Sequence, residues 1–522
     1  MKLRWQAIVS ALVIAFLFVA APAGASDVRV EGTTDTTDSN FIQDIIQPGF
    51  EAAYPQYTLK YHSTGTGAAL TNARAGQADA VLTHAPATEA QFVQDGFSLE
   101  PFGRAIFYND YVLIGHDADP ANVLGADPHD AIGAMEAIAA AGAAGNATWI
   151  SRGDNSGTHV QEGAMWCMTS GVPLHSLGAG RCEPDNGSGG TPSWYKKTGL
   201  GQAGTVQVTA QCNFPSASAN SCYSMTDRGT YDNLQSQGAL AGVKVVTEKN
   251  DPNARGGENL LINPFHAYVV NPNNPAFAGK NINFNTDGAT AFLDYLTSPQ
   301  LQQQLLSYPS TANPRFFPDA TPQIQVKALP KAIDATNKLT VKATLLNKLP
   351  GAGPVQGAAA ALQFSAGISG SPFGPISPNF GDLVSGTSDA AGNLSLGARL
   401  TRTGQLQLAV PQFQDLTATT ANVGAMRVTA APTISLHRDG SRLKLTGKLT
   451  PTVTGKDATV QVLGRQPGSK RYRRLATKKL RNKAKKYSIT VTLGAGQWKL
   501  KTRYRNPGIV LPGDSKVRSA SA

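Results

Sequence analysis

The stretch Asp27-Val-Arg-Val-Glu-Gly-Thr-Thr-Asp-Thr-Thr-Asp-Ser39 opens the region whose pattern decides the fold. Val28 and Val30 alternate with charged residues, as expected for a short strand. A polar turn follows, and the apolar residues of 41–50 then recur on one face of a helix. The stretch therefore predicts a strand, a hydroxyl-rich turn and a helix in direct succession.

The same alternation continues downstream. Tyr57–Tyr61 and Ala80–Thr83 are predicted strands, whereas Ala68–Ala75 and 88–95 are predicted helices. Strands that alternate with helices predict a parallel sheet covered on both faces. In such sheets ligands bind where the carboxyl ends of strands meet the amino ends of helices. We assign the α/β region to residues 26–310.

The pattern changes after this region. Residues 311–330 are punctuated by prolines and are predicted to be a linker. Short alternating strands with glycine turns follow, which predicts two small all-β sandwiches of the immunoglobulin-like type at 331–430 and 431–522. The predicted strands are Leu339–Thr344, Asn393–Leu396, Gly404–Ala409, Arg442–Thr446, Ala458–Val462, Tyr487–Thr492 and Gly496–Lys501.

Length and charge agree with several chemically distinct domains. The chain has 522 residues, which is too long for one compact domain. Its formal net charge is +11. Residues 26–325 carry 14 basic and 28 acidic side chains, whereas residues 431–522 carry 22 basic and 3 acidic ones. The net charge is therefore the sum of an acidic α/β region and a strongly basic C-terminal domain.

Residues 1–25 resemble a targeting segment rather than a domain. Lys2 and Arg4 precede an apolar run at 7–20, and small residues follow at Ala21–Ala25. This arrangement is typical of a secretory signal peptide, and an uncleaved anchor helix is the alternative. The apolar run is shorter than the ~20 residues that a membrane-spanning helix needs. We expect a mature protein that is secreted, extracellular or associated with the cell envelope.

The four cysteines fit an oxidising compartment. Cys167, Cys182, Cys212 and Cys222 lie within one short window and allow three pairings. Closing a short loop costs less entropy, which favours Cys167–Cys182 and Cys212–Cys222. The spacings lack the CxxC pairs of zinc sites, so we predict two disulfides and no metal site.

Four segments of the α/β region place hydroxyls, glycines or an arginine at predicted strand-to-helix turns. They are Gly32–Ser39, Ser63–Gly67, Ser151–His159 and Met225–Tyr231. Helix amino termini offer unpaired N–H groups and the positive end of the helix dipole, which together hold anions. Each segment alone fits an ordinary helix cap. The four together predict an oxyanion-binding cleft between two lobes.

The region also resembles a known family, the tungstate-binding solute receptors of bacterial ABC importers, which are related to molybdate and phosphate receptors. The resemblance covers residues 27–308. The matching runs are Ser63–Leu70, Ala78–Pro86, Tyr108–Gly115, Asp119–Ala121, Ser151–His159, Trp194-Tyr195, Met225–Tyr231 and Phe292–Pro299, together with the threonine-rich turn. The resemblance implies a two-lobed, periplasmic-binding-protein-like receptor that closes on its ligand. It also implies the membrane subunits of an ABC importer as partners.

The resemblance implies oxyanion contacts from all four turns. The candidate ligand-binding residues are Thr34, Thr36, Thr66, Ser151, Arg152, Ser156, Thr158 and Arg228. One departure is Asp35, which stands where the family tends to keep a hydroxyl. The segments around 167–192 and 212–222 resemble insertions relative to the family.

The choice of ligand depends on protonation. The run Arg152–Thr158 also resembles the turn of phosphate receptors, in which a carboxylate accepts a proton from bound phosphate, a role that Asp154 could fill. Tungstate and molybdate carry no proton at neutral pH, so Asp154 would have to point away from them or pair with an arginine. The other runs favour tungstate or molybdate, and phosphate is the alternative ligand.

We expect a binding protein that is monomeric, has no cofactor and is not an enzyme. A serine hydrolase would need a nucleophile, a base and an orienting group. Ser156 and His159 could lie near one helix face, but the chain has no GxSxG turn and no HExxH helix.

The basic C-terminal domain is the second functional feature. Its densest charge runs are Lys470–Arg474, Lys478–Arg481 and Lys483–Lys486. Because a signal peptide is predicted, we expect no nucleic-acid partner and favour an anionic cell-wall polymer, bound through residues 431–522. Anionic lipid headgroups and an ordinary solvated surface remain as alternatives. An envelope interaction protein with a receptor-like domain is therefore the rival to a transport receptor.

Overall fold

The computed structural model describes residues 24–214, 220–368 and 379–521. The chain forms two compact units, and the boundary between them in the sequence lies between Pro318 and Asp319. The predicted signal peptide lies almost entirely outside the described residues. Among the described residues, no helix is both long and apolar enough to cross a membrane.

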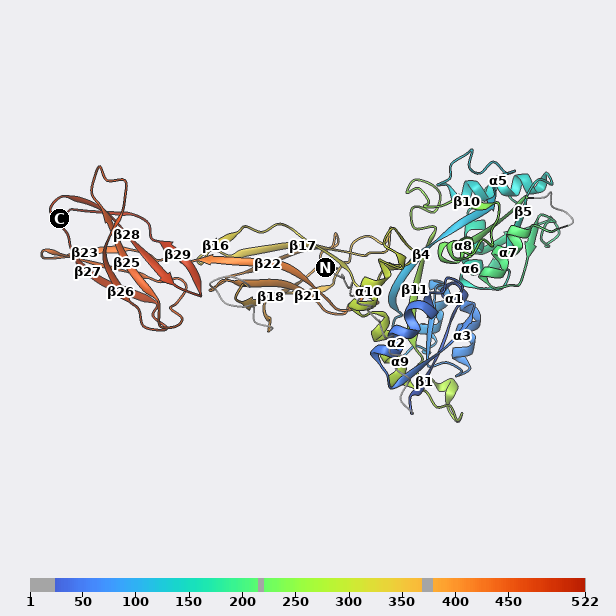
Figure 1. Ribbon diagram of the computed structural model, residues 1–522, viewed down its shortest axis with the longest axis horizontal. Helices are drawn as coiled ribbons and strands as arrows, with labels where there is room; N and C mark the ends of the chain where they lie inside the picture. Colours follow the sequence, from blue (N-terminus) through green and yellow to red (C-terminus); the bar gives the residue numbers. More distant parts are fainter. Residues whose placement is uncertain (1–23, 215–219, 369–378, 522) are drawn as a thin grey trace, which may run out of the picture. The chain divides into compact units, whose positions relative to one another are not determined.

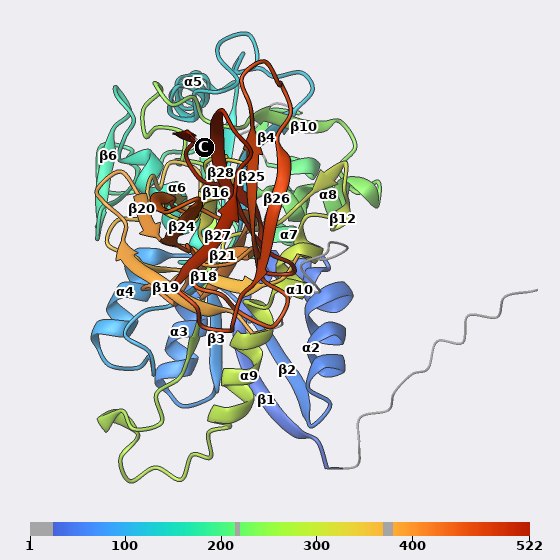
Figure 2. The ribbon, with the colours of Figure 1, turned by 90° about the vertical axis from the view of Figure 1, so that its left-hand side faces the viewer.

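The first unit is an α/β domain with two lobes. Lobe 1, residues 26–110 and 262–318, contains a sheet in the order β2-β1-β3-β11-β4. Its strands are β1 (Ser26–Thr33), β2 (Tyr57–Thr64), β3 (Ala80–Thr83), β11 (Ile262–Val269) and the first half of β4 (Arg104–His116). The flanking helices α2 (Gln47–Ala53) and α3 (Thr66–Arg74) lie on opposite sides of β1 (Figures 1 and 2).

Lobe 2, residues 111–261, is built on the second half of β4. Tyr111–Gly115 of β4 pair with β9, and β10 lies on the other side. The strands are β5 (Thr148–Ser151), β8 (Tyr195–Lys197), β9 (Cys222–Asp227) and β10 (Val243–Thr247), with the hairpin β6 (Leu174–Gly178) and β7 (Arg181–Pro184). The helices are α5 (Ala131–Ala143), α6 (Gly157–Trp166), α7 (Gln202–Gln211) and α8 (Arg228–Ser236).

The prediction of a parallel sheet is correct only in part. β1 is parallel to β2 and β3, and β5 is parallel to β8 and β9. However, β11 is antiparallel to β3 and β4, and β4 is antiparallel to β9. The chain alternates strands and helices locally, but β4 passes from one lobe to the other and β11 returns, which the local pattern does not reveal.

The predicted local elements match the structure closely in lobe 1. The predicted helix at 41–50 is divided into a π-helical turn at Ile42–Ile46 and α2, and a short helix α1 (Thr34–Asp38) precedes it. Its apolar face is buried with the core of lobe 1. The other helices of this lobe are α4 (Pro86–Gln94), the 3-10 helix Pro275–Phe277, α9 (Thr286–Leu296) and α10 (Pro299–Leu305).

Both predicted disulfides are confirmed. Cys167 is bonded to Cys182, and Cys212 is bonded to Cys222. The first bond joins the end of α6 to β7, and the second joins the end of α7 to the start of β9.

The second unit is rich in β strands. Its first half contains β15 (Gln323–Val326), β16 (Ala332–Asp334), β17 (Leu339–Leu346), β18 (Ala359–Ala366), β19 (Gly381–Thr387), β20 (Asn393–Ala398), β21 (Gly404–Val410) and β22 (Thr419–Thr429). Its second half contains β23 (Ser435–Asp439), β24 (Arg442–Lys448), β25 (Thr459–Arg465), β26 (Arg473–Lys479), β27 (Lys486–Thr492), β28 (Gln497–Asn506), β29 (Val510–Asp514) and β30 (Arg518–Ser521). The all-β character of this region is as predicted, and the immunoglobulin-like arrangement stays a prediction.

The two halves of this unit are joined more tightly than separate domains would be. Thr429 of β22 pairs with Leu511 of β29, so one continuous sheet path runs through both halves. A single cluster of buried apolar side chains also extends from Leu339 to Val510. The predicted boundary at 430/431 falls between β22 and β23.

The segment predicted as a linker is structured on both sides of Pro318. Before it, the short strand β14 (Phe317–Pro318) pairs with β4, and Phe316 is buried against Phe41 and Phe107 of lobe 1. The hairpin β12 (Pro309–Ser310) and β13 (Asn313–Pro314) lies just upstream. After it, β15 pairs with β17. The prolines concealed these elements because proline is tolerated at edge strands.

Candidate functional site

The two lobes meet where several helices begin. The N-caps of α3 and α6 are Gly65, from lobe 1, and Ser156, from lobe 2. A Cβ atom on Gly65 would lie 3.1 Å from Ser156 Cα, and one on Gly67 would lie 3.1 Å from the carbonyl oxygen of Asn155. Such close approach favours glycine, because a Cβ atom at either position would press on the backbone of the other lobe. The cleft between the lobes is therefore closed in this structure.

Arg152 occupies the centre of this interface and is buried, with 2% of its side chain exposed. Its Nη1 donates to Thr34 Oγ1 across the cleft at 3.2 Å and to Gln202 Oε1 at 2.7 Å. Its Nε and Nη2 donate to Asp154 Oδ2 at 3.1 and 2.7 Å. The guanidinium thus presents one edge to Asp154 and the other to the cleft.

For an unprotonated dianion to bind, Asp154 would have to point away from it or pair with an arginine. The structure shows that Asp154 pairs with Arg152. Its Oδ1 also accepts from the backbone N–H of Ser156 at 3.0 Å. Burial alone would raise the pKa of Asp154, but the charge of Arg152 and the hydrogen bonds from Ser156 outweigh it and hold the pKa below its usual value. Asp154 is therefore an ionised partner that orients Arg152.

Other predicted residues lie at the amino ends of α3 and α6, at the same interface. Thr158, in the first turn of α6, donates to the same Gln202 Oε1 at 2.8 Å. Ser156 Oγ accepts from the backbone N–H of His159 and caps α6. Thr66 begins α3, and its Oγ1 accepts from the backbone N–H of His84 at 3.5 Å. All three predicted residues are buried.

Thr36 and Ser151 are also buried, but their hydroxyls are directed toward the protein. Thr36 donates to the carbonyl oxygen of Thr33 and contacts the Tyr61 hydroxyl at 2.8 Å. Ser151 donates to Glu162 at 2.9 Å. These two residues support the turns in this arrangement rather than point into the cleft.

Arg228 is not brought together with the other predicted residues. Its guanidinium donates to Asp110 and Glu248. Burial alone would lower the pKa of Arg228, but the two carboxylates outweigh this effect and raise the pKa above its usual value. It lines a separate cavity of about 370 Å³ together with Tyr108 and Phe317. The sequence placed it beside the ligand because it follows β9, but its neighbour Asp227 is the residue that caps α8.

Three residues that the sequence did not assign to the ligand lie at the centre of the cleft. The carboxylate of Asp35 is fully buried, and neither oxygen has a hydrogen-bond partner among the described residues. Arg152 Nη1 lies 3.7 Å from one oxygen, and His84 Nε2 lies 3.4 Å from the other. Gln202 was missed because a glutamine at a helix start carries no distinctive pattern.

Asp227 adds a second buried carboxyl group. It accepts from the backbone N–H of Thr230 at 2.9 Å, while its other oxygen has no partner among the described residues. Burial and the nearby charge of Asp35 raise the pKa of Asp227 well above its usual value. Among the described residues, the cleft therefore contains more acidic groups than Arg152 alone can balance.

Asp38 makes a hydrogen bond that spans the cleft. Its Oδ2 accepts from the backbone N–H of Ala203 at 2.8 Å, and it thereby caps α7 of lobe 2 from lobe 1. Burial raises the pKa of Asp38 to about 6. Because this value lies above that of an unfolded chain, the folded protein binds a proton more tightly. The associated stability is present at acid pH and is lost as the pH rises through about 6.

We therefore expect Asp38→Asn to stabilise the protein above about pH 6, because the neutral amide oxygen still accepts from Ala203 without a buried charge. The expected gain is about 3 kcal/mol in the free energy of unfolding at pH 7 and above, and it should vanish near pH 4. Denaturant unfolding of both proteins from about pH 4 to pH 8 measures this difference. Parallel pH profiles would contradict the role assigned to Asp38.

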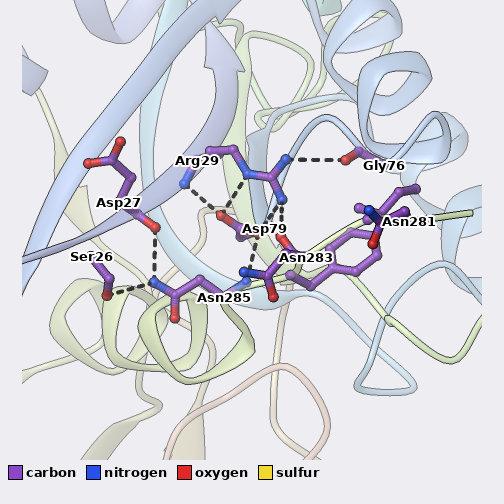
Figure 3. A pocket seen from close by; sticks show the side chains of 10 residues that line it. Ser26, Asp27, Arg29, Gly76, Asp79, Asn281, Asn283 and Asn285 are labelled. Carbon is purple, nitrogen blue, oxygen red and sulfur yellow. Dashed lines mark hydrogen bonds and ion pairs between the residues drawn. The ribbon is translucent and has the colours of Figure 1, made fainter.

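A second cavity lies in lobe 1, away from the cleft, and has a volume of about 700 Å³ (Figure 3). The side chain of Arg29 donates to Asp79, to the carbonyl oxygen of Gly76 and to that of Asn283. The Arg29–Asp79 pair thus ties β1 and β3 to the loop before α9. We interpret this cavity as a structural feature, since its arginine connects these segments of lobe 1.

The side chains of Ser156 and His159 each engage the backbone in this arrangement. Ser156 Oγ accepts a backbone N–H, and the ring Nδ1 of His159 binds the backbone N–H of Asn155 at 3.0 Å. Within the described residues, no group of three histidine, cysteine or acidic side chains is placed to hold a metal ion. What the cleft offers is a buried guanidinium, hydroxyls and helix amino termini, which is the chemistry of anion binding.

Comparison with known proteins places these features in a family. A family model described as a PBP superfamily domain matches residues 20–300. The chain is 33% identical over 296 residues to a protein of Haloferax volcanii named "Putative ABC transporter anion-binding protein", which covers 55% of this chain and 70% of that protein. It is 30% identical over 290 residues to the tungstate-binding protein TupA of Peptoclostridium acidaminophilum, covering 55% of this chain and 84% of that protein.

Among solved structures, the tungstate-binding protein TupA from Desulfovibrio alaskensis G20 is 31% identical. The match covers 56% of this chain and 99% of that chain, with a TM-score of 0.41. The family model extends over more than half of the 522 residues and covers lobe 2 and most of lobe 1. This chain is a member of the PBP superfamily, in which its two-lobed α/β unit is the solute-binding domain.

Proposed function

We propose that the chain captures a tetrahedral oxyanion between its two lobes, as the extracellular receptor of an ABC importer. The observation that carries the proposal is Arg152, a buried guanidinium at the closed interface whose outward edge contacts Thr34 and Gln202. An oxyanion that takes the place of these acceptors would receive the guanidinium N–H groups in the same directions. The amino ends of α3 and α6 lie at the same interface and add backbone donors.

Tungstate and molybdate are the ligands that we propose first. The support comes from the relatives, because two of them are named tungstate-binding proteins. The pairing of Asp154 with Arg152 also removes the objection that a free carboxylate at that position would repel an unprotonated dianion.

Phosphate is a second candidate, favoured by one specific observation. Asp35 places two buried carboxylate oxygens without hydrogen-bond partners beside Arg152. A fully ionised dianion would be repelled there, whereas hydrogen phosphate could donate its proton to the carboxylate. In the cleft, Asp35 therefore favours a protonated oxyanion, whereas Arg152 can bind any oxyanion.

Calorimetry against tungstate, molybdate, sulfate and phosphate tests both candidates. We expect stoichiometric binding of at least one of these anions, and the absence of any binding would contradict the receptor function. Asp35→Asn keeps the shape of the side chain but removes its charge. If tungstate or molybdate is the ligand, this variant should bind it at least about tenfold more tightly. If phosphate is the ligand, the variant should bind it about tenfold more weakly.

We further propose that the receptor works outside the cytoplasm as a monomer and delivers the anion to the membrane subunits of the importer. The support is the superfamily to which the chain belongs, together with two disulfides, which persist in oxidising compartments.

A further inference from the structure

We propose that the outer face of the sheet formed by β26, β25 and β28 binds an anionic cell-wall polymer whose charges are phosphodiesters. This inference does not depend on the ligand of the cleft. The three strands are neighbours in the order β28-β25-β26 (Figure 1). The term basic face is used for seven of their residues, Arg465, Arg474, Lys479, Lys499, Lys501, Arg503 and Arg505.

The alternation of burial along β28 defines this face. Trp498, Leu500, Thr502 and Tyr504 are buried, with at most 2% exposed, and point into the core. The intervening residues are therefore directed outward, and they are Lys499, Lys501, Arg503 and Arg505. Four successive outward positions of one strand are cationic, at intervals of roughly 6.6 Å along the strand.

Cross-strand pairing adds the cations of the neighbouring strands to the same face. Lys499 pairs with Arg465 of β25, and Arg505 pairs with Thr459. Thr459 pairs in turn with Lys479 of β26. Leu463 of β25 lies between Lys501 and Arg474 in the same way. Because directly paired residues point to the same side of a sheet, these cations form one surface.

Protection of a sheet edge does not explain this surface. Lysine on an edge strand discourages aggregation, and this could account for the charges of β26. β28, however, lies between β25 and β29 and has no free edge along its length there. The cations in the row on β28 repel one another. This repulsion destabilises the folded domain, and a bound anion would relieve it.

Few neighbouring groups offset this charge. Asp514 accepts from Lys501 and Arg503, and it is one of only three acidic residues in 431–522. Tyr472 lies under Arg465 and Lys501, whose charged ends are 5.3 and 4.6 Å from its ring centre. The tyrosine holds these two side chains in place by cation–π interactions.

The chemistry of the face fits a phosphodiester chain. The guanidinium groups of Arg474 and Arg505 can bind phosphate oxygens with two parallel N–H groups. Arg465, Arg503 and the lysines add positive charge, since Arg503 holds Asp514 with two of its N–H groups and Arg465 donates to Ser469. A flexible polymer with regularly repeated phosphates can follow the row on β28 and contact several cations at once. Many weak contacts of this kind give binding that falls steeply with salt.

The test compares two variants that lose the same number of charges from the mature full-length protein. The basic-face variant carries serine at Arg474, Lys479, Lys499 and Arg505, all of which are exposed. The control variant carries serine at Arg442, Lys444, Lys448 and Lys486, which are exposed on the sheet of β24 and β27. There Arg442 and Lys444 pair with Thr492 and Thr490, and Lys448 pairs with Lys486, so the cations do not form a continuous row like that on β28.

Binding is measured to immobilised poly(glycerol phosphate) and, separately, to vesicles of phosphatidylcholine and phosphatidylglycerol. We expect the wild-type protein to bind the polymer more tightly than the vesicles. The basic-face variant should lose at least about tenfold in affinity for the polymer, whereas the control variant should change by less than about threefold. Both variants should keep wild-type oxyanion binding, which separates this proposal from that for the cleft.

Three results would overturn the proposal. They are no polymer binding by the wild-type protein, equal losses in the two variants, and preferential binding to vesicles. If the basic-face variant does not fold, the salt dependence of the wild-type protein decides instead. Polymer binding should weaken strongly between about 50 mM and about 500 mM NaCl, and unchanged binding across this range would exclude a cationic docking face.

Discussion

Replacing Arg152 with lysine is expected to weaken oxyanion binding by about 100-fold or more. Lysine keeps the positive charge beside Asp35 and Asp154, so the buried carboxylates retain a counterion. It cannot, however, hold Asp154 with one edge and present N–H groups to the cleft with the other. The loss of two hydrogen bonds from a charged donor accounts for this magnitude.

The lysine variant is more informative than Arg152→Ala. The alanine variant would leave buried carboxylates without a partner, which typically costs 3–5 kcal/mol of stability, so lost binding could reflect unfolding. Calorimetry with the anion that binds the wild-type protein, together with the melting temperature, gives the two readouts needed. The matched control is Arg228→Lys, which alters a guanidinium held by Asp110 and Glu248. Comparable losses in both variants would contradict the central role of Arg152.

Local elements were predictable from the sequence because they depend on short-range patterns. β3 has the predicted bounds Ala80–Thr83, and α3 at Thr66–Arg74 overlaps the prediction almost completely. The direction of the central strands was not predictable, because β11 is brought beside β3 and β4 by contacts between distant parts of the chain. The structured ends of the linker were missed because their prolines are typical of loops, although proline is tolerated at edge strands.

The candidate site was predictable to the extent that it depends on helix starts. Thr34, Thr66, Arg152, Ser156 and Thr158 follow strands, and the fold brings such positions to one interface. Which arginine faces the cleft depends on the position of carboxylates elsewhere in the chain. Asp110 lies far from Arg228 in the sequence, so their pairing appears only in three dimensions. Asp154 is two residues from Arg152, and its pairing with an arginine was one of two outcomes that the sequence allowed.

The acidic groups of the cleft were likewise not predictable from the sequence. Asp35, Asp38 and Asp227 occupy turn positions where aspartate is a common capping residue, so the sequence alone does not distinguish them. In the closed arrangement Asp35 and Asp227 are buried and Asp38 is half-buried. Their proximity then gives the cleft a dependence on protons that neither its composition nor its net charge indicated.

Gly157→Ala is expected to reduce oxyanion affinity by about 5- to 150-fold, because it obstructs closure of the lobes. Gly157 begins α6 in lobe 2 and packs against the ring of His84 in lobe 1. A Cβ atom there would lie only 2.4 Å from His84 Cε1. The ring cannot move aside easily, since it lies 2.8 Å from Asn263 Oδ1 and stacks on Phe265. The methyl group would therefore hold the lobes apart and weaken the binding of an anion that contacts both lobes.

Gly201→Ala provides the matched control, because it also lies at the interface but has room for the added carbon. A Cβ atom on Gly201 would lie 3.5 Å from Thr34 Cγ2, which is an ordinary van der Waals distance. This variant should bind oxyanion within about threefold of the wild-type protein. Small-angle scattering of Gly157→Ala with saturating anion should show a less compact α/β unit than the wild-type protein. Wild-type affinity and compactness in Gly157→Ala would mean that the closed arrangement is not the form that binds the anion.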